Sequence, residues 1–233
     1  MKTLVIGDPH GKLPKGLTQI IKKNKIELII VTGEIPCVPM EVFAPRKLKK
    51  YGYRYADNNY KQLLDKICLY KIPVIILKGN AYVTSEGSQI TRKLFEKYKN
   101  LFYKRTGKVK IKDHEFVLFD MIWEVWAYKG FKLGKWPHQF SSRSDYRLKK
   151  FGKLLKEAKD PILISHAPPF GILDKVPKKG SVGSKIVLKM IKKYKPKYVF
   201  CGHIHEGKGK KKIGKTTVIN AGCCGDYFII NLK

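Results

Sequence analysis

Short apolar runs, each followed closely by a residue that can bind a metal, constrain the fold of this chain most. Five of them span residues 3–7, 28–33, 74–79, 162–165 and 199–202. Leu17, Ile20 and Ile21 lie between the first two runs at helical spacing, which indicates a strand, a helix and a second strand. Such a unit pairs its strands in parallel, and the carboxyl ends of parallel strands meet at one edge of a sheet. We therefore expect an α/β fold in which side chains remote in sequence share that edge.

The rest of the chain continues this alternation and adds a hairpin. Residues 108–112 and 115–119 are predicted strands joined around Asp113 and His114. Helices are expected near residues 57–70, 89–99, 145–158 and 183–194, and closing strands at 216–220 and 227–232. Two strand–helix runs that flank a hairpin favour a sandwich of sheets covered by helices. Without a clear linker or repeat, the chain is expected to be a single domain, residues 1–233, with long loops at about 36–59 and 123–147.

The charge balance is strongly basic, with 49 Lys and Arg against 18 Asp and Glu and a formal net charge of +31. An excess of this size favours anionic partners. Two segments are candidates for contact with RNA or DNA, because one alternates cations with aromatic rings and the other clusters lysines after a candidate metal ligand. The candidate residues are Lys49, Lys50, Tyr51, Tyr53, Arg54, Lys210 and Lys211. Two solvated loops are the simpler interpretation of the same segments.

The cysteines and the length of the apolar runs bear on location. Five cysteines without a C-x-x-C pair argue against a disulfide framework or a thiolate zinc site, and favour a reducing compartment. The N-terminal apolar run is shorter than the core of a signal peptide, and no later run approaches the length of a membrane span. We expect a cytoplasmic protein that does not associate with a membrane.

The residues that follow the predicted strands form a set of metal ligands without a thiolate. The candidates are Asp8, His10, Glu34, Asn80, His166, His203 and His205. A mixture of nitrogen and oxygen ligands suits Mn, Fe, Zn, Co or Ni better than Ca or Mg. Two such ions about 3.5–4 Å apart can promote an in-line displacement at phosphorus. Hydrolysis of a phosphate ester is therefore the expected reaction.

Five motifs carry a family resemblance. In order they are Asp8-Pro9-His10, Gly33-Glu34, Gly79-Asn80, Ser165-His166-Ala167-Pro168-Pro169 and Gly202-His203-Ile204-His205. They resemble the ordered motifs of the calcineurin-like metallophosphoesterases, especially the small single-domain prokaryotic members, and residues 217–222 resemble the closing strand and turn of that fold. The resemblance implies a four-layer α/β/β/α sandwich that holds two divalent transition metal ions, with Mn favoured.

The resemblance also implies a role for each motif residue. One metal is expected to bind Asp8, His10, Glu34 and His205, and the other to bind Glu34, Asn80, His166 and His203. A hydroxide that bridges the two metals is expected to attack phosphorus. His166, Asn80 and His203 are the expected catalytic residues, because they would hold the phosphoryl oxygens together with the ions.

Two positions depart from the family pattern. Glu34 stands where the family has a bridging aspartate, so one extra methylene must be accommodated between the metals. Ala81 stands where the family has a histidine after Gly-Asn, and that histidine is assigned to the leaving group or the phosphate. Loss of a general acid typically slows a reaction by about 10²–10⁴-fold, most for poor leaving groups.

Two hypotheses follow. The leading one is a dinuclear metal-dependent phosphoesterase that acts on phosphodiesters in preference to monoesters. The alternative is a catalytically impaired phosphoesterase scaffold that acts as a nucleic-acid-binding protein, which Glu34, Ala81 and the net charge favour. A phosphate ester is the expected substrate in the first case, and RNA or DNA the expected partner in the second.

Overall fold

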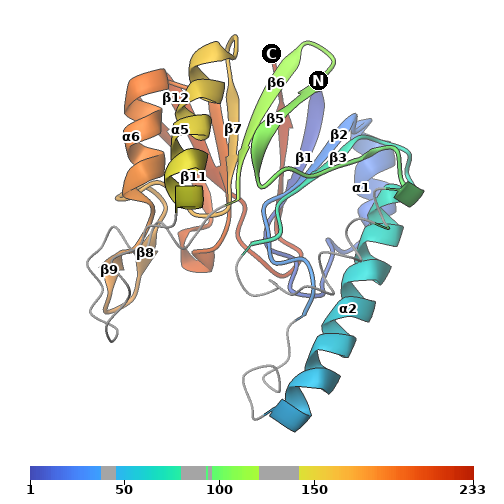
Figure 1. Cartoon of the computed structure of the whole chain (residues 1–233). Coiled ribbons are helices and arrows are strands. Elements are labelled where there is room, and N and C mark those ends of the chain that lie inside the picture. The colour runs from blue at the N-terminus through green and yellow to red at the C-terminus, as the bar shows by residue number, and fades with distance from the viewer. Residues whose placement is uncertain (38–45, 80–92, 94–95, 121–141) are drawn as a thin grey trace. The chain divides into compact units, whose positions relative to one another are not determined.

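The computed structural model describes residues 1–37, 46–79, 93, 96–120 and 142–233 (Figure 1). The chain divides into two compact units. The first unit consists of Met1–Tyr103 and Ala221–Lys233, and the second of Lys104–Asn220. Each unit has its own sheet and its own hydrophobic core.

The first unit has a five-stranded sheet in the order β13-β1-β2-β3-β4. Its strands are β1 (Lys2–Ile6), β2 (Leu28–Val31), β3 (Val74–Ile76), β4 (Leu101–Phe102) and β13 (Tyr227–Asn231). The first four are parallel, whereas β13 is antiparallel to β1. The carboxyl ends of β1, β2 and β3 therefore lie at the same edge.

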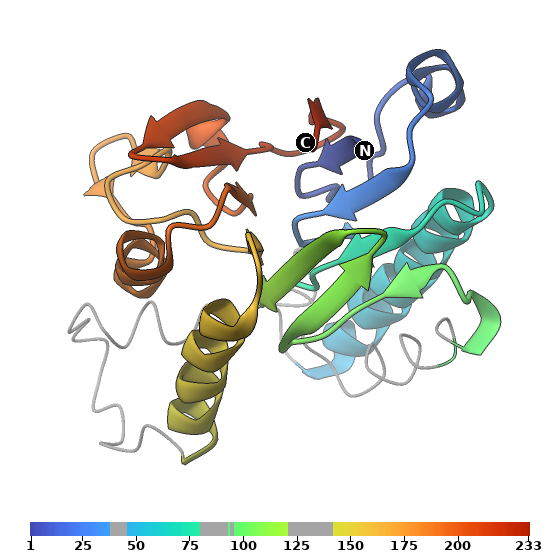
Figure 2. The same ribbon diagram turned by 90° about the horizontal axis from the view of Figure 1, so that it is seen from above.

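Two helices cover one face of this sheet, α1 (Leu17–Asn24) and α2 (Arg46–Cys68), as Figure 2 shows from above. Tyr60, Leu64 and Ile67 of α2 are fully buried and share one core with alternate residues of the strands, such as Leu4 and Ile29. Their spacing of three to four residues puts them on one side of the helix. Burial of this apolar face holds α2 against the sheet.

The second unit has a six-stranded sheet in the order β11-β12-β10-β7-β6-β5. Its strands are β5 (Thr106–Ile111), β6 (His114–Phe119), β7 (Ile162–Ser165), β10 (Tyr198–Cys201), β11 (Gly209–Ile213) and β12 (Thr216–Asn220). The four inner strands are parallel, and both edge strands are antiparallel to their neighbours. The carboxyl ends of β7 and β10 are therefore adjacent.

Helices α5 (Ser142–Glu157) and α6 (Lys185–Tyr194) cover one face of the second sheet. Phe151 of α5 stacks on Phe119 of β6 with ring centroids 4.0 Å apart. Ser184 caps α6, since its hydroxyl accepts a hydrogen bond from the Val187 amide at 3.1 Å. A two-stranded hairpin of β8 (Lys175–Val176) and β9 (Gly180–Ser181) precedes α6, and the short helix η2 (His205–Gly207) follows β10.

The predicted α/β class, the parallel pairing of the first strands and the hairpin near residue 113 are confirmed. The predicted loop at 36–59 is wrong from residue 46 onward, because α2 begins there. Its first turns are rich in lysine and lack the apolar face that marks the later turns, so the pattern hid the true start. Likewise, the predicted loop at 123–147 ends at residue 142, where α5 begins.

Some predicted elements fall partly on residues that the structure does not describe, and the predicted number of domains is not tested. The predicted helix at 89–99 falls largely on residues that the structure does not describe, as does 123–141 of the second predicted loop. The single-domain assignment stays a prediction beside the two compact units. In the described part of the chain, no helix combines the length and the apolar character needed to cross a bilayer.

Candidate metal centre

The carboxyl ends of β1 and β2 present three candidate ligands in the first unit. Asp8 is fully buried, His10 is half-buried, and Glu34 is buried just beyond β2. The two segments are joined by backbone, because the His10 amide donates to the Glu34 carbonyl oxygen at 2.8 Å. Parallel pairing of β1 with β2 therefore brings these residues to one edge of the sheet, as the sequence predicts.

Asp8 is fixed on two sides. Its amide donates to the Gly222 carbonyl oxygen at 3.0 Å, and its carbonyl oxygen accepts from the Cys224 amide at 2.9 Å. Its carboxylate accepts a hydrogen bond from the Thr32 hydroxyl at 3.0 Å. A buried carboxylate held in this way has a fixed orientation, which suits a metal ligand.

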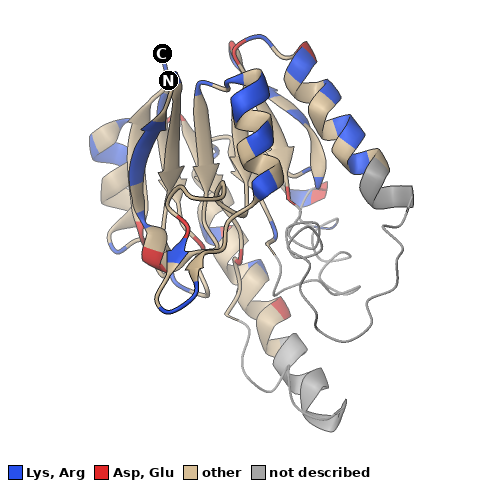
Figure 3. Cartoon of the chain, turned by 90° about the vertical axis from the view of Figure 1, so that its left-hand side faces the viewer, with Lys and Arg blue, Asp and Glu red and all other residues tan. Residues whose placement is uncertain are grey.

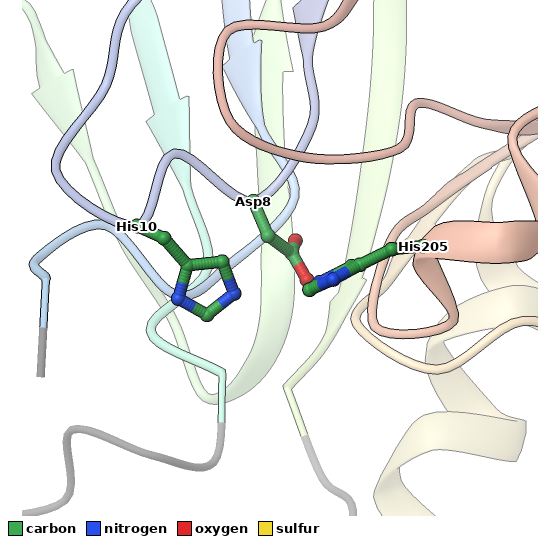
Figure 4. A group of neighbouring side chains, drawn as sticks. All are labelled: Asp8, His10 and His205. Atoms are coloured by element: carbon green, nitrogen blue, oxygen red, sulfur yellow. The ribbon is translucent and has the colours of Figure 1, made fainter. Parts of the chain in front are cut away.

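Asp8 and His10 point their donor atoms at a common point. One carboxylate oxygen of Asp8 and one ring nitrogen of His10 lie within 4.8 Å of each other. Both residues come from the loop that follows β1 (Figure 4). Two ligands of a single ion have this separation, so the pair can serve as part of a metal site.

Glu34 and Gly79 fit together sterically. A β-carbon placed on Gly79 would collide with the Glu34 carboxylate and with the Glu34 backbone nitrogen. The Glu34 side chain therefore extends toward the carboxyl end of β3, directly before Asn80. The extra methylene of Glu34 is accommodated in part by the missing side chain at residue 79.

Three of the candidate ligands have left-handed backbones. The φ angles of His10, Glu34 and His203 are 43°, 38° and 65°. This conformation costs a residue with a side chain roughly 1–2 kcal/mol. Strain of this kind is retained where the surrounding structure imposes it, and it is common at functional sites. In the described residues, the other non-glycine residues with positive φ are exposed or half-buried, whereas Glu34 is buried.

The second unit brings two imidazoles together. His166 follows β7 and His203 follows β10, and their ring centroids are 5.0 Å apart at an angle of 57°. The Gly202 amide donates to the His166 carbonyl oxygen at 3.0 Å, so the two strand ends are tied directly. His166 is fully buried, whereas His203 and His205 are half-buried. His203 can therefore be reached from solvent, but His166 cannot.

Asn220 secures the loop that carries His203 and His205. Its side-chain amide donates to the carbonyl oxygen of Ile204 at 2.8 Å and to that of Leu173 at 3.0 Å. Ile204 is the residue between the two histidines. Asn220 therefore acts on the position of both imidazoles without being a ligand itself.

A cysteine also lies near Asp8. Burial, followed by a hydrogen bond with Cys224, raises the pKa of the Cys223 thiol to about 12. In the metal-free chain Cys223 is therefore a neutral thiol at physiological pH. The ligands at this strand end are oxygen and imidazole nitrogen, which suits a transition metal of intermediate softness.

Comparison with known proteins finds a similarity to one superfamily. A family model described as metallophosphoesterase, calcineurin superfamily, matches residues 128–233, the stretch that contains His166, His203 and His205. Human Metallophosphoesterase domain-containing protein 1 is 36% identical over 137 residues, which are 55% of this chain and 39% of that protein. Over this stretch the chain is similar to the calcineurin superfamily of metallophosphoesterases. The resemblance predicted from the five motifs is thereby confirmed.

Other comparisons add a sequence relative and two solved structures. A Methanocaldococcus jannaschii protein is 33% identical over 102 residues, 42% of this chain and 45% of that protein. The chain thus spans less than half the length of these curated relatives. A dimetal phosphatase from Danio rerio matches 97% of this chain and 88% of its own with a TM-score of 0.61 at 12% identity. A Thermus thermophilus protein matches 99% and 98% with a TM-score of 0.58 at 14% identity. Similarity at this identity shows the fold alone.

Several predicted site residues lie outside the described part of the chain. Asn80 and Ala81 fall there, so the fourth ligand of the second set is not described. Lys49, Lys50, Tyr51, Tyr53 and Arg54 belong to α2, and their side chains lie outside the described residues. Lys210 and Lys211 are exposed on β11, an edge strand where the sequence was interpreted as a solvated loop.

Two residues that support the candidate site were missed by the sequence interpretation. Thr32 follows β2 and bonds Asp8 across 24 residues of sequence, which no local pattern could indicate. Asn220 did carry a signal, because it is a polar residue at the end of the apolar strand β12, just like the predicted ligands. The ligand roles of the seven candidate residues stay a prediction.

Proposed function

We propose that the chain is a dinuclear metal-dependent phosphoesterase that hydrolyses phosphodiesters in preference to monoesters. The observation that carries the proposal is the set of buried oxygen and imidazole donors at the carboxyl ends of parallel strands, with Asp8 beside His10 and His166 beside His203. The similarity to the metallophosphoesterase superfamily supports hydrolase chemistry in general. The substrate and the mechanism are our inference.

The first metal set consists of Asp8, His10, Glu34 and His205. Asp8, His10 and His205 offer one carboxylate oxygen and two imidazole nitrogens as a candidate group. These donors fit Mn, Fe, Zn, Co or Ni by their chemistry, and we favour Mn because half of the expected donors are oxygens. Glu34, with its carboxylate directed toward Gly79, would be shared with the second set.

The second metal set consists of Glu34, Asn80, His166 and His203. The two imidazoles are adjacent, as their centroid separation of 5.0 Å shows. His166 is fully buried and would serve as a ligand only, whereas the half-buried His203 would also be accessible to a substrate. Asn80 would add an amide oxygen from the carboxyl end of β3.

Two bound ions supply Lewis acidity at phosphorus and lower the pKa of the attacking water. The chain's own contribution is positioning. Thr32 holds the Asp8 carboxylate, Asn220 holds the loop of His203 and His205, and the left-handed backbone of Glu34 directs its side chain. His203 would also hold a phosphoryl oxygen of the substrate.

Alanine in place of histidine at residue 81 should restrict which leaving groups the chain can expel. No imidazole follows Asn80, so a general acid at that position is absent from the sequence. The expected consequence is a preference for esters whose alcohol leaves readily as an anion. Bis-p-nitrophenyl phosphate meets this requirement and is a diester.

The test compares hydrolysis of bis-p-nitrophenyl phosphate and p-nitrophenyl phosphate by Mn-loaded protein, with and without a chelator. We expect chelator-sensitive turnover that is faster on the diester. His166→Asn should lower turnover by at least about 100-fold, whereas His114→Asn, at a half-buried hairpin position outside the site, should leave it unchanged. Absence of turnover with both metals confirmed in place would refute the proposed activity.

The alternative hypothesis, a catalytically impaired phosphoesterase scaffold that acts as a nucleic-acid-binding protein, is not favoured. The left-handed backbone of the buried Glu34 supports a retained site, because strain at a buried position has a cost. We also propose a reducing location such as the cytoplasm, since all five cysteines are free and Cys224 is exposed. Thiol titration of freshly isolated protein should find five free thiols, and a disulfide would contradict this location.

A further inference from the structure

A group of exposed lysines lies next to the histidine loop of the second unit. We call it the basic rim, and it consists of Lys175, Lys178, Lys179, Lys208 and Lys211. Glu206 is the only acidic residue between Lys175 and Lys215. Figure 3 shows Lys and Arg along β11 and over the neighbouring α6 on this side of the second unit. The rim therefore presents a nearly uncompensated positive field.

The β8–β9 hairpin, which carries three of these lysines, is tied to the histidine loop. Asn220 bonds both Leu173, just before the hairpin, and Ile204, between the two histidines. Gly207 of η2 passes so close to the Leu173 carbonyl that a β-carbon there would collide with it. The base of the hairpin is thus held next to η2, which begins at His205.

The hairpin is also rigid at its base. The buried Asp174 carboxylate accepts hydrogen bonds from the Gly171 amide at 2.9 Å and the Gly183 amide at 2.7 Å, which lie at the two ends of the hairpin segment. The Ser184 amide donates to the Pro168 carbonyl oxygen at 2.7 Å, two residues after His166. The same platform therefore contacts the strand ends of both β7 and β10.

Strand β11 adds Lys211 on the hairpin side. Lys211 pairs with Val218, whose side chain belongs to the core beneath α5 and α6, so the two residues share that face of the sheet. Gly209, two residues earlier on this face, lies near the side chain of Leu173. Lys211 and the hairpin lysines therefore line the same side of the unit.

A simpler explanation is that lysines on an edge strand prevent sheet-to-sheet aggregation. It accounts for β11, but it does not explain the lysines of the hairpin. At the opposite edge, Lys108 of β5 is neutralised by Glu115 at 2.7 Å. Among the described residues, Lys178, Lys179 and Lys211 have no carboxylate within ion-pairing distance.

We propose that the basic rim binds the phosphate backbone of a polynucleotide and presents it to His203 and His205. This makes nucleic acid the substrate class of the phosphodiesterase, and in that respect it rests on the proposed function. A chain of phosphates fits several lysines in a row better than a single small phosphate ester does, since each phosphate can meet one ammonium group.

The test measures the affinity of the full chain for a fluorescein-labelled single-stranded DNA of about 20 nucleotides. Excess chelator is present, and the fluorescence anisotropy of the DNA reports binding at a series of salt concentrations. The double variant Lys178→Gln and Lys211→Gln removes one lysine from the hairpin turn and one from β11. The matched control is Lys112→Gln and Lys110→Gln, one lysine from the β5–β6 turn and one from β5 at the opposite sheet edge. Lys178 and Lys112 both have left-handed backbones, with φ of 60° and 53°, so the substitutions are equally strained.

The rim variant should bind about 20-fold more weakly near 0.1 M salt, with a salt slope smaller by about 1.4, because each lost phosphate contact removes about 0.7 from the slope. The control should stay within about threefold of the unsubstituted chain. Equal losses in both variants would mean that net charge alone acts, and would overturn the proposal. Binding to phosphatidylserine vesicles but not to DNA would also overturn it.

The experiments can refute the basic rim and the phosphodiesterase independently of each other. DNA binding in chelator with the expected contrast, but no turnover of bis-p-nitrophenyl phosphate with metal, would retain the rim and refute the phosphodiesterase. Turnover of that small diester without DNA binding would retain the phosphodiesterase and refute the rim.

Discussion

The Thr32 hydroxyl donates a hydrogen bond to the Asp8 carboxylate at 3.0 Å, and both residues are fully buried. Thr32 lies just beyond β2 and Asp8 just beyond β1, so the parallel pairing of these strands creates the contact. The bond fixes the carboxylate in one orientation before any metal arrives. It is a support for the site rather than part of it.

Thr32→Val should therefore weaken Mn binding by about 10–100-fold, because it keeps the shape of the side chain but leaves the Asp8 carboxylate without this donor. Isothermal titration calorimetry measures the change. Thr32→Ser retains the hydroxyl and should bind Mn within a few-fold of the unsubstituted chain. Equal affinity in all three proteins would show that Thr32 has no positioning role.

Gly79→Ala should disturb the metal site through Glu34. The added β-carbon would meet the Glu34 carboxylate, and the φ of 76° adds strain. Gly171 is a matched control, since its φ is 79° and a β-carbon there meets nothing within 4 Å. Gly171→Ala should lower the free energy of unfolding by about 1–2 kcal/mol from strain alone, with unchanged Mn binding. If Gly79→Ala were no worse than this control by denaturant unfolding and by calorimetry, Glu34 would not occupy the assigned position.

Asn220→Ala should affect both stability and metal binding. It removes two hydrogen bonds from a buried amide, which should lower the free energy of unfolding by about 2–3 kcal/mol, and it releases the loop of His203 and His205. Asn100 offers a control, because its amide donates to the Cys68 carbonyl oxygen at 3.1 Å and to that of Ile72 at 2.8 Å, both in the first unit. Asn100→Ala should lower stability by a similar amount while Mn affinity stays unchanged. Similar Mn affinities in the two variants would refute the supporting role of Asn220.

The Lys108–Glu115 pair should make stability depend on pH. A hydrogen bond from Lys108 at 2.7 Å, followed by one from the Lys159 amide at 2.9 Å, lowers the pKa of Glu115 below its ordinary value of 4.5. The pair therefore stabilises the chain fully above about pH 4.5, and the gain is lost as the pH falls through the lowered pKa. At neutral pH, Glu115→Gln should lower the free energy of unfolding by about 0.5–1 kcal/mol, and the difference should shrink toward the lowest pH at which the chain stays folded.

Glu157 provides the comparison for that pH series. It faces Lys153 at 3.7 Å, and both side chains are more than half exposed. Glu157→Gln should change unfolding by urea very little at any pH. A pH-independent effect of Glu115→Gln would mean that packing, and not the ion pair, accounts for its contribution.

The ends of the strands were predictable because the signal is local. Apolar runs such as 162–165 mark buried parallel strands, and the polar residue that follows each run must lie at the sheet edge. The sequence pattern therefore predicts that Asp8 lies near His10 and His166 near His203, and the structure has both pairs. What those residues bind remains a prediction.

Other features depend on contacts that sequence alone does not encode. The start of α2 was missed because its first turns are basic and have no apolar face, and β11 was missed because three consecutive lysines hide the alternation of an edge strand. The fit of Glu34 against Gly79 requires knowing that β2 and β3 are neighbours in register. Glu34 was predicted as a ligand of both metals and as a departure from the family pattern, and the structure places its carboxylate against Gly79.

The measurement that tests the central claim most directly is the metal content of the purified chain by elemental analysis after Mn loading and desalting, combined with turnover of bis-p-nitrophenyl phosphate with and without chelator. We predict about two Mn per chain and turnover that the chelator abolishes and added Mn restores. One metal or none, with no turnover on any activated diester, would contradict a dinuclear phosphodiesterase.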